Sequence, residues 1–305
     1  MTLLHWTLPL PAGYRRDDVI AFHSRDGEAV AEQVTPTGLR KGILLQGVPV
    51  ALDVALTDAA AICRAEIDGA ANTGLQAPLH GALLNILGLR IDPLPFAQLA
   101  ANDTLLAPLV RLNPGLRIVQ SASPFEALTW AIIGQQINLP FAISLRRTFI
   151  LQAGRRHGSG LWCYPEARDV ARLAIEDLTS RKFSRAKAET VLRLARLVDA
   201  GELSLELPPS GDVEAISQAL LAVKGIGPWT VNYALLRGYG YADCSLHGDV
   251  AIRAALQKLL GEEVKPDMAR TEQWLRHYAP HRTMAAAHLW ASLHAPEKNS
   301  SPTRE

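Results

Sequence analysis

The sequence predicts an α+β fold, with an antiparallel β-sheet at the front of the chain and helices in the remainder. Between Leu3 and Leu56, short apolar runs are separated by proline and glycine, which is typical of strands joined by turns. Apolar residues alternate along one such run, at Val48, Val50, Leu52 and Val54. Further along, LNPGLR marks a loop before a long region in which the apolar spacing is helical.

The predicted sheet is built from short strands and is interrupted by one helix. The strands are expected within residues 5–10, 29–38 and 41–56. The helix is expected at 14–25, because Asp17 and Asp18 suit a helix N-terminus. Its apolar side contains Val19, Ile20 and Phe22.

The pattern changes near Thr57. In TDAAAICRAEIDG, the apolar residues Ala60, Cys63 and Ile67 recur at a helical spacing. We therefore expect the sheet to end at Leu56 and a helix to occupy residues 57–69.

The composition indicates a globular protein without a strong overall charge. With 305 residues, of which 48% are hydrophobic and 20% charged, the chain can bury a large core in two or three packed units. The net charge of +1 neither indicates nor excludes a nucleic-acid partner, so evidence for one must come from a local site.

The cysteines and the N-terminus indicate a cytoplasmic protein. The three cysteines, Cys63, Cys163 and Cys244, lie far apart, which disfavours a disulfide framework, a structural zinc or an iron–sulfur centre. The N-terminal residues lack a secretory signal pattern, and no run of eighteen apolar residues predicts a membrane span.

A well-marked helix begins at Ser123. Ser123 is a candidate N-cap, proline follows it, and Glu126 at the third position completes a capping box. The helix is expected to end or bend within 134–140, where Gln135, Gln136 and Asn138 favour a solvated helix end unless they hold something there. A basic amphipathic helix is expected later, within 180–203.

Two helices separated by a glycine-containing break are predicted at about 212–238. Asp212 begins the first helix, and the segment Lys224 to Gly227 ends it. Pro228 suits the first turn of the second helix, which is expected to stop at Gly238. The pattern therefore predicts a helix, a hairpin and a helix.

The hairpin has two interpretations. Exposed backbone N–H groups at a helix N-terminus bind a phosphate without net charge, which would allow DNA binding by a nearly neutral chain. Alternatively, Gly225 and Gly227 serve only the sterics of a tight corner between two helices. The break alone does not separate these interpretations.

The segment VKGIGPWTVNYALLRG, followed by SLHGDVAIRAAL, resembles the helix-hairpin-helix DNA glycosylase superfamily. Further similarity lies in HWTLPLPAGY, VIAFHSRDGEAV, NPGLR, PFEALTWAIIGQQ, RAKAETVLRLARLVDAGEL and HRTMAAAHLW, and is greatest to the inducible alkylpurine branch, 3-methyladenine DNA glycosylase II. The resemblance implies an N-terminal α/β sheet domain at 1–95 and an all-α glycosylase core of two subdomains at 96–294. The polar residues 295–305 are expected to be a disordered tail.

The resemblance places Asp249 on the catalytic aspartate of the superfamily. An ionised carboxylate near C1′ would stabilise the positive charge that develops on the sugar when the glycosidic bond breaks. A cap on the helix VAIRAALQKLL is the alternative role for Asp249, and the two roles are compatible. Asp243, in the same loop, is the second candidate.

Strand-cleaving relatives have a lysine nucleophile where this chain has Trp229. The resemblance therefore implies a monofunctional enzyme that leaves an abasic site and has no lyase activity. Lys224 lies within the hairpin and is assigned to a phosphate contact together with Gly225, Ile226 and Gly227.

The resemblance also implies the groups that handle a base flipped out of the duplex. An aromatic pocket is assigned to Phe22, Trp229, Tyr233 and Trp290, each of which could alternatively be a core residue. Gln136 falls on the position of the intercalating wedge, where the bacterial 3-methyladenine DNA glycosylase II that this chain resembles has leucine. Backbone carbonyls of Leu221, Val223 and Ile226 are expected to hold a structural sodium or potassium ion, and no catalytic cofactor is expected.

The sequence therefore predicts a monomeric DNA glycosylase of base excision repair, acting on alkylated purines such as 3-methyladenine and 7-methylguanine in double-stranded DNA. Two alternatives remain. The first is a non-catalytic helix-hairpin-helix DNA-binding protein, and the second is a glycosylase for mismatched or oxidised bases on the same scaffold.

Overall fold

The computed structural model describes residues 2–69, 73–207 and 211–293. The chain forms two compact units, of which unit 1 comprises 1–92 and 117–241 and unit 2 comprises 93–116 and 242–305. The first break, after Asp92, lies near the predicted domain boundary at residue 95, and the sheet shares its unit with the helices of 117–241. The predicted disordered tail lies outside the described residues.

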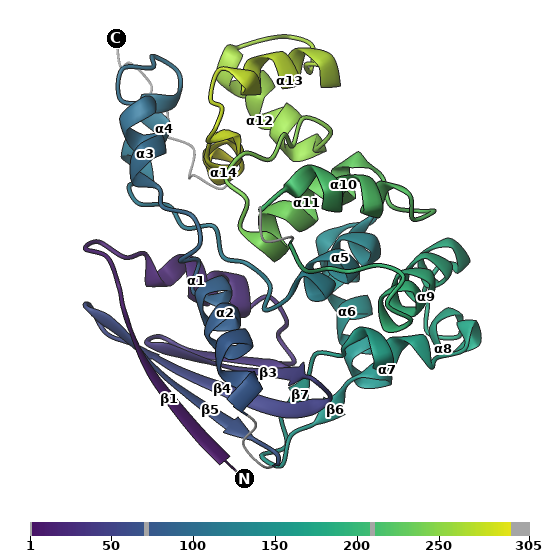
Figure 1. The fold of residues 1–305 in the computed structure, drawn as a ribbon. Coiled ribbons are helices and arrows are strands. Elements are labelled where there is room, and N and C mark those ends of the chain that lie inside the picture. Colours follow the sequence, from purple (N-terminus) through teal and green to yellow (C-terminus); the bar gives the residue numbers. More distant parts are fainter. Residues whose placement is uncertain (1, 70–72, 208–210, 294–305) are drawn as a thin grey trace, which may run out of the picture. The chain divides into compact units, whose positions relative to one another are not determined.

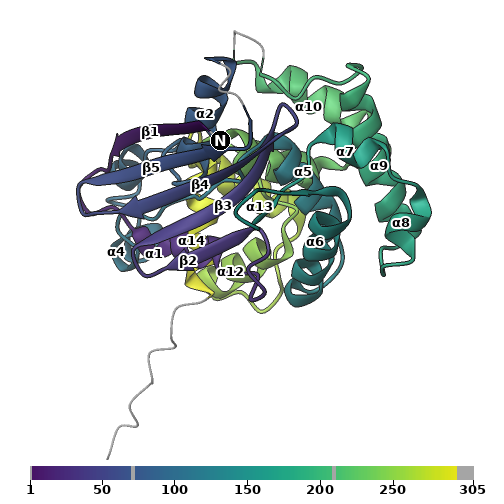
Figure 2. The same cartoon turned by 90° about the horizontal axis from the view of Figure 1, so that it is seen from below.

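Unit 1 contains a five-stranded antiparallel sheet with the strand order β1-β5-β4-β3-β2 (Figure 2). Its strands are β1 (Thr2–Pro9), β2 (Glu32–Thr35), β3 (Gly38–Leu45), β4 (Val48–Leu56) and β5 (Ala60–Ile67). The predicted strand 41–56 is in fact a hairpin, which turns at Gln46 and Gly47, both with positive φ. The predicted α+β class with an N-terminal antiparallel sheet is confirmed.

The predicted helix at 57–69 is wrong, because β5 occupies this segment. Burial alternates along the strand, with Ala61 and Cys63 buried and Ile62 47% exposed. The spacing Ala60, Cys63, Ile67 fits a helix, but the segment is also apolar at a period of two, at Ala61, Cys63, Ala65 and Ile67. Pairing decides the outcome, since β5 lies between β1 and β4 and joins them into one sheet.

Two helices cover one face of the sheet, α1 (Arg16–His23) and α2 (Gln76–Ile86), the second preceded by a 3₁₀ turn, η1 (Thr73–Leu75) (Figure 1). Val19 from α1 and Leu79 and Leu83 from α2 are fully buried with Leu52 of the sheet in one apolar core. Burial of these side chains is the main force that fixes the helices on the sheet.

The second part of unit 1 is helical. Its elements are α5 (Pro124–Gly134), α6 (Leu139–Ala153), β6 (Arg155–Arg156), β7 (Trp162–Cys163), α7 (Ala167–Ala171), α8 (Ile175–Thr179), α9 (Arg185–Asp199), α10 (Val213–Leu221), α11 (Pro228–Ala234) and a π-helical turn, η2 (Leu235–Tyr239). The predicted stop at Gly238 is wrong. Gly240, with φ +67, ends the helix, whereas a Cβ on Gly238 would approach the Cα of Pro124 to 2.9 Å.

A buried ion cluster ties the sheet to α5 and α6. Lys41, 1% exposed, places its Nζ 2.5 Å from Glu32 Oε1 and 2.8 Å from Glu126 Oε1. Arg146 contacts both carboxylates at 3.1 and 2.8 Å. Ser123 accepts the Glu126 N–H as predicted, but the Glu126 carboxylate accepts the N–H of the preceding Ala122, so the reciprocal half of the predicted capping box is wrong.

The regular secondary structure in the described residues of unit 2 is entirely helical. Its helices are α3 (Leu94–Leu99), α4 (Leu106–Leu112), α12 (Val250–Leu260), α13 (Met268–Arg276) and α14 (Arg282–Ser292). Phe96 of α3 stacks on His288 of α14 with ring centroids 5.5 Å apart, and Asp103 accepts the Tyr278 hydroxyl at 2.8 Å. Across 2–69, 73–207 and 211–293, no helix is long and apolar enough to cross a membrane.

Candidate functional site

The predicted helix-hairpin-helix is present in unit 1. Asp212 caps α10 by accepting the Glu214 N–H at 2.9 Å, and α11 begins at Pro228. Between them, the Ile226 N–H donates to the Val223 carbonyl at 3.0 Å and closes the turn. The motif could be predicted from the sequence because the cap at Asp212 and the proline at 228 each act within a few residues.

The two hairpin glycines differ in what an added side chain would meet. Gly225 has φ +99, and a Cβ there would overlap the Thr190 side chain. Gly227 has φ −110, and a Cβ there would meet no protein atom within 4 Å. Packing therefore explains Gly225 but not Gly227, whose missing side chain leaves the N-terminus of α11 open to an external group.

One side of α9 holds the hairpin against the end of α5. Thr190 packs on Gly225, and Arg193 donates from Nη1 to the Lys224 carbonyl at 2.9 Å. Lys187 donates from Nζ to the carbonyls of Ile133 and Gln135, both at 2.6 Å, and burial lowers the pKa of Lys187. The sequence predicted this basic amphipathic helix but not its role, because its partners lie more than thirty residues away.

Not all of the amide side chains after α5 simply face solvent at a helix end. Gln135 donates to Thr230 Oγ1 at 3.0 Å and to the Gly225 carbonyl at 3.3 Å, so it bridges α5 to the hairpin. Asn138 caps α6 by accepting the Phe141 N–H at 3.0 Å. Gln136, the predicted wedge, is exposed and has φ +55, a backbone conformation that a non-glycine residue adopts at a cost.

Three of the four predicted pocket aromatics lie in unit 1. Trp229 and Tyr233, one turn apart on α11, have ring centroids 5.3 Å apart. The Tyr233 hydroxyl accepts the indole N–H of Trp130 at 2.8 Å. Phe22 is half-buried against the sheet core, which agrees with its alternative packing role.

The sequence did not single out two arginines beside Phe22. The guanidinium carbon of Arg25 lies 3.8 Å from the Phe22 ring centroid and 5.2 Å from that of Trp130. Arg237 lies 5.0 Å from the Phe22 centroid and donates to the Val119 carbonyl. We call Phe22, Arg25, Trp130, Trp229, Tyr233 and Arg237 the aromatic–guanidinium cluster.

Asp249 and Trp290 lie in unit 2 and contact each other. Asp249 caps α12, because its Oδ1 accepts the N–H groups of Ala251 and Ile252 at 2.9 and 3.0 Å. The same oxygen accepts the indole N–H of Trp290 at 3.2 Å. The cap predicted as an alternative role for Asp249 is therefore present, and it leaves the carboxylate half-buried beside an aromatic ring.

The rival acid, Asp243, is held in an ion pair. Arg282 donates to Asp243 from Nε and Nη2, both at 2.8 Å, and its backbone N–H donates to the same carboxylate at 3.3 Å. A bidentate arginine pair of this kind fixes a carboxylate in place. Asp243 therefore has a structural task in joining its loop to α14.

No metal or reactive thiol emerges from the described part of the chain. Among these residues, no group of three or more His, Cys, Asp or Glu could hold a metal ion. The three cysteines form no disulfide within the described residues and are buried, and burial raises the pKa of each thiol to about 12. The cation site at the carbonyls of Leu221, Val223 and Ile226 stays a prediction.

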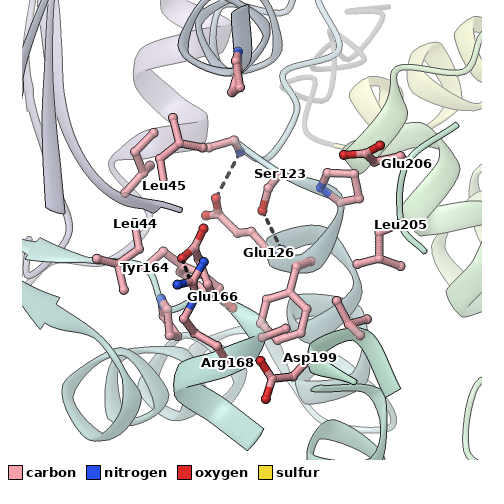
Figure 3. A pocket seen from close by; sticks show the side chains of 18 of the residues that line it. Leu44, Leu45, Ser123, Glu126, Tyr164, Glu166, Arg168, Asp199, Leu205 and Glu206 are labelled. Carbon is pink, nitrogen blue, oxygen red and sulfur yellow. Dashed lines mark hydrogen bonds and ion pairs between the residues drawn. The ribbon is translucent and has the colours of Figure 1, made fainter. Parts of the chain in front are cut away.

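A cavity of about 630 Å³ lies elsewhere in unit 1 (Figure 3). It is lined by β3, the start of α5 and the end of α9, and by none of the predicted site residues. Of its acidic side chains, Glu166 accepts the N–H groups of Gln46 and Gly47 at 2.7 and 2.6 Å, and Glu126 belongs to the buried ion cluster. The cavity is therefore distinct from the hairpin and the aromatic–guanidinium cluster.

Comparison with known proteins identifies curated relatives but no matching family model. The chain is 32% identical over 206 residues to a DNA-3-methyladenine glycosylase of Bacillus subtilis, covering 67% of this chain and 68% of the relative. It is 32% identical over 197 residues to a putative DNA-3-methyladenine glycosylase of the same organism, covering 63% and 67%. DNA-3-methyladenine glycosylase 2 of Escherichia coli is 28% identical over 187 residues, covering 61% and 63%.

Solved structures share the fold. A 3-methyladenine DNA glycosylase from Archaeoglobus fulgidus matches with a TM-score of 0.77 at 21% identity, covering 93% of this chain and 97% of that one. An 8-oxoguanine glycosylase/lyase of Clostridium acetobutylicum in complex with DNA matches with a TM-score of 0.70 at 15% identity, covering 96% and 97%. The scaffold is therefore one on which glycosylases of different base classes are built.

Proposed function

The chain belongs to the DNA-3-methyladenine glycosylase family, and on that premise we propose that it releases alkylated purines, of the 3-methyladenine and 7-methylguanine class, from duplex DNA. The product is an abasic site, and the reaction belongs to base excision repair. We further propose that the chain acts as a cytoplasmic monomer and that no cofactor takes part in the chemistry.

The contrast between Asp243 and Asp249 carries the assignment of the catalytic group. Arg282 fixes Asp243, whereas Asp249 sits at a helix N-terminus against Trp290. Two backbone N–H groups and the Trp290 indole N–H hold the Asp249 carboxylate in one orientation. We therefore assign to Asp249, and not to Asp243, the stabilisation of positive charge on the sugar.

The reaction is a hydrolysis at C1′. The bond from C1′ to the base nitrogen breaks, its electron pair leaves with the base, and water oxygen forms the new bond to C1′. One proton of that water leaves to solvent, and a base that was cationic departs neutral. Asp249 stabilises the positive charge on the sugar and orients the water.

Unit 1 supplies the groups that we assign to the DNA. The N-terminus of α11, uncovered at Gly227, would receive a phosphate, with Lys224, Gly225 and Ile226 in the same hairpin. Phe22, Trp229 and Tyr233 would contact the extruded base, and Gln136, on its exposed turn, would fill the gap in the duplex. In unit 2, Trp290, which donates to Asp249, is the fourth aromatic residue that we assign to the base.

We expect no strand cleavage, because Trp229 stands where strand-cleaving relatives have lysine and offers no amine for attack on the sugar. Lys224 is the nearest lysine in the hairpin, and the carbonyl contact with Arg193 fixes its backbone there. A sodium or potassium ion on the carbonyls of Leu221, Val223 and Ile226 would add positive charge toward a phosphate and would not take part in hydrolysis.

A panel of duplex oligonucleotides tests the proposal. Each carries one lesion, either 3-methyladenine, 7-methylguanine, hypoxanthine or 8-oxoguanine, and released base and strand breaks are measured separately. We expect free methylated purine and intact abasic strands, with no borohydride-trapped covalent complex. Tight binding without release of any base would identify a DNA-binding protein, and release of 8-oxoguanine alone would identify a different base class.

A further inference from the structure

The Phe22 ring in the aromatic–guanidinium cluster already has a cation beside it. The Arg25 guanidinium carbon lies 3.8 Å from the ring centroid, well inside the roughly 6 Å range of a cation–π contact. Its Nε donates to the Phe22 carbonyl at 2.7 Å, which holds the arginine at the C-terminal end of α1. A cationic base that approached Phe22 would therefore meet a positive charge.

Nearby carboxylates do not neutralise that charge by direct pairing. Within the described residues, Arg25 forms no ion pair, and the adjacent Asp26 is bound by Arg147 at 2.6 Å. Glu32 and Glu126, whose fields reach Arg25, are contacted by Lys41 and Arg146. Burial lowers the pKa of Arg25 against the opposing effect of these acids, as expected for a guanidinium withdrawn from water.

Arg237 places a second guanidinium close to the Phe22 ring. It lies 5.0 Å from the Phe22 centroid, and burial lowers its pKa, while a hydrogen bond with Tyr233 opposes that effect. A guanidinium can only donate, so the Tyr233 oxygen accepts from Arg237 and from Trp130. Tyr233 retains its own O–H, which can donate to an acceptor on a base.

These groups favour one class of leaving base. A neutral purine leaves C1′ with an electron pair and develops negative charge, which nearby guanidiniums and a phenol donor stabilise. A cationic alkylpurine leaves as a neutral molecule and gains nothing from them, and its bound state is opposed by the positive charge.

We propose that Arg25 is a specificity-determining residue that shifts base release from cationic alkylpurines toward neutral purine lesions with hydrogen-bond acceptors. The inference rests on the proposed function, because it requires that Phe22 face the extruded base. It concerns the ratio of the release rates of two lesions rather than the existence of the activity.

Single-turnover release of 7-methylguanine, which is cationic in DNA, and of hypoxanthine, which is neutral, tests this inference in the full chain. Arg25→Met removes the charge and keeps an apolar stem on Phe22. We expect the ratio of the 7-methylguanine rate to the hypoxanthine rate to rise about tenfold, whereas Arg25→Lys, which keeps the charge, leaves it within about twofold.

Arg16→Met is the matched control. Arg16 begins α1, the helix that contains Phe22. Its side chain is 42% exposed and lies 3.5 Å from Asp58, so its loss should leave the ratio unchanged. Thermal unfolding of each variant separates specificity from misfolding, and if Arg25→Met is unfolded, Arg25→Gln takes its place. An unchanged ratio, or an equal decrease in the release rates of both lesions, overturns the inference and leaves the proposed function intact. Absence of release of every lesion by the unaltered chain overturns the proposed function and the inference with it.

Discussion

Trp290 donates its indole N–H to Asp249 Oδ1 at 3.2 Å, on the oxygen that also caps α12. One carboxylate thus receives two backbone donors and one aromatic donor, all from unit 2. These bonds fix the direction of the carboxylate before any DNA arrives. A preorganised acceptor of this kind stabilises developing positive charge without rearranging during the reaction.

Asp249→Asn is expected to abolish most base release while leaving the fold intact. Asparagine caps a helix about as well as aspartate, so the free energy of unfolding should change by less than about 0.5 kcal/mol. The negative charge is lost, and single-turnover release should fall roughly 100- to 1,000-fold. DNA affinity, measured by fluorescence anisotropy on an abasic-analogue duplex, should stay within about threefold.

The control for this substitution is Asp243→Asn in the same loop. It breaks the bidentate pair with Arg282 and should lower the unfolding temperature while slowing release much less. The reverse outcome, with Asp243→Asn inactive but stable and Asp249→Asn active, would transfer the catalytic role to Asp243.

Trp290→Phe separates the donor from the ring. Phenylalanine keeps an aromatic face but cannot donate to Asp249, so base release should fall about tenfold from the loss of one hydrogen bond to a charged group. Helix α12 retains its backbone donors to Asp249, and thermal unfolding should shift little. Wild-type release by Trp290→Phe would show that the indole N–H does not position the carboxylate.

The caps and breaks of this chain could be predicted because their causes are local. Ser123, Asp212 and Asp249 each accept an N–H two or three residues ahead, so a short stretch of sequence contains both partners. The strand at 60–67 could not be predicted in this way, since its pairing with β1 and β4 is decided outside the segment. Short apolar runs take the structure that their neighbours require.

The site residues that the sequence did not single out have distant partners. Lys187 binds carbonyls at 133 and 135, and Arg25 lies against Trp130, more than a hundred residues away. A single arginine or lysine in a sequence is most often a side chain exposed to solvent. Only the fold brings these cations to the hairpin and to Phe22.

Lys41→Met tests the buried ion cluster. Removing Lys41 leaves Glu32 and Glu126 with one cation fewer in a buried site, and we expect a loss of about 3–5 kcal/mol in the free energy of unfolding at pH 7. Urea unfolding measures this loss, and Lys265→Met at an exposed position is the control, expected to stay within about 0.5 kcal/mol.

The cluster also predicts a pH dependence for Lys41→Met. Burial alone would raise the pKa of Glu32, but Arg146 and Lys41 hold it well below its usual range. A carboxyl with a lowered folded pKa contributes stability above its unfolded pKa, about 4.3, and that stability is lost as pH falls through the folded value. Without Lys41, the folded pKa of Glu32 rises, so the difference between variant and wild type should shrink as pH falls through the folded pKa of the variant. A difference that stays constant from pH 7 down to the acid unfolding of the proteins would show that Lys41 contributes by packing rather than by charge.

The two hairpin glycines give the sharpest test of the DNA contact. Gly225→Ala places a Cβ into Thr190 at positive φ and should lower the free energy of unfolding by at least about 2 kcal/mol. Gly227→Ala meets no protein atom and should cost about 0.5 kcal/mol, but its methyl group covers the N-terminus of α11. If a phosphate binds there, Gly227→Ala should weaken DNA binding about tenfold with an unchanged unfolding temperature. Unaltered affinity in a folded Gly227→Ala protein would leave the hairpin as a steric corner, and the DNA contact would have to be sought elsewhere on unit 1.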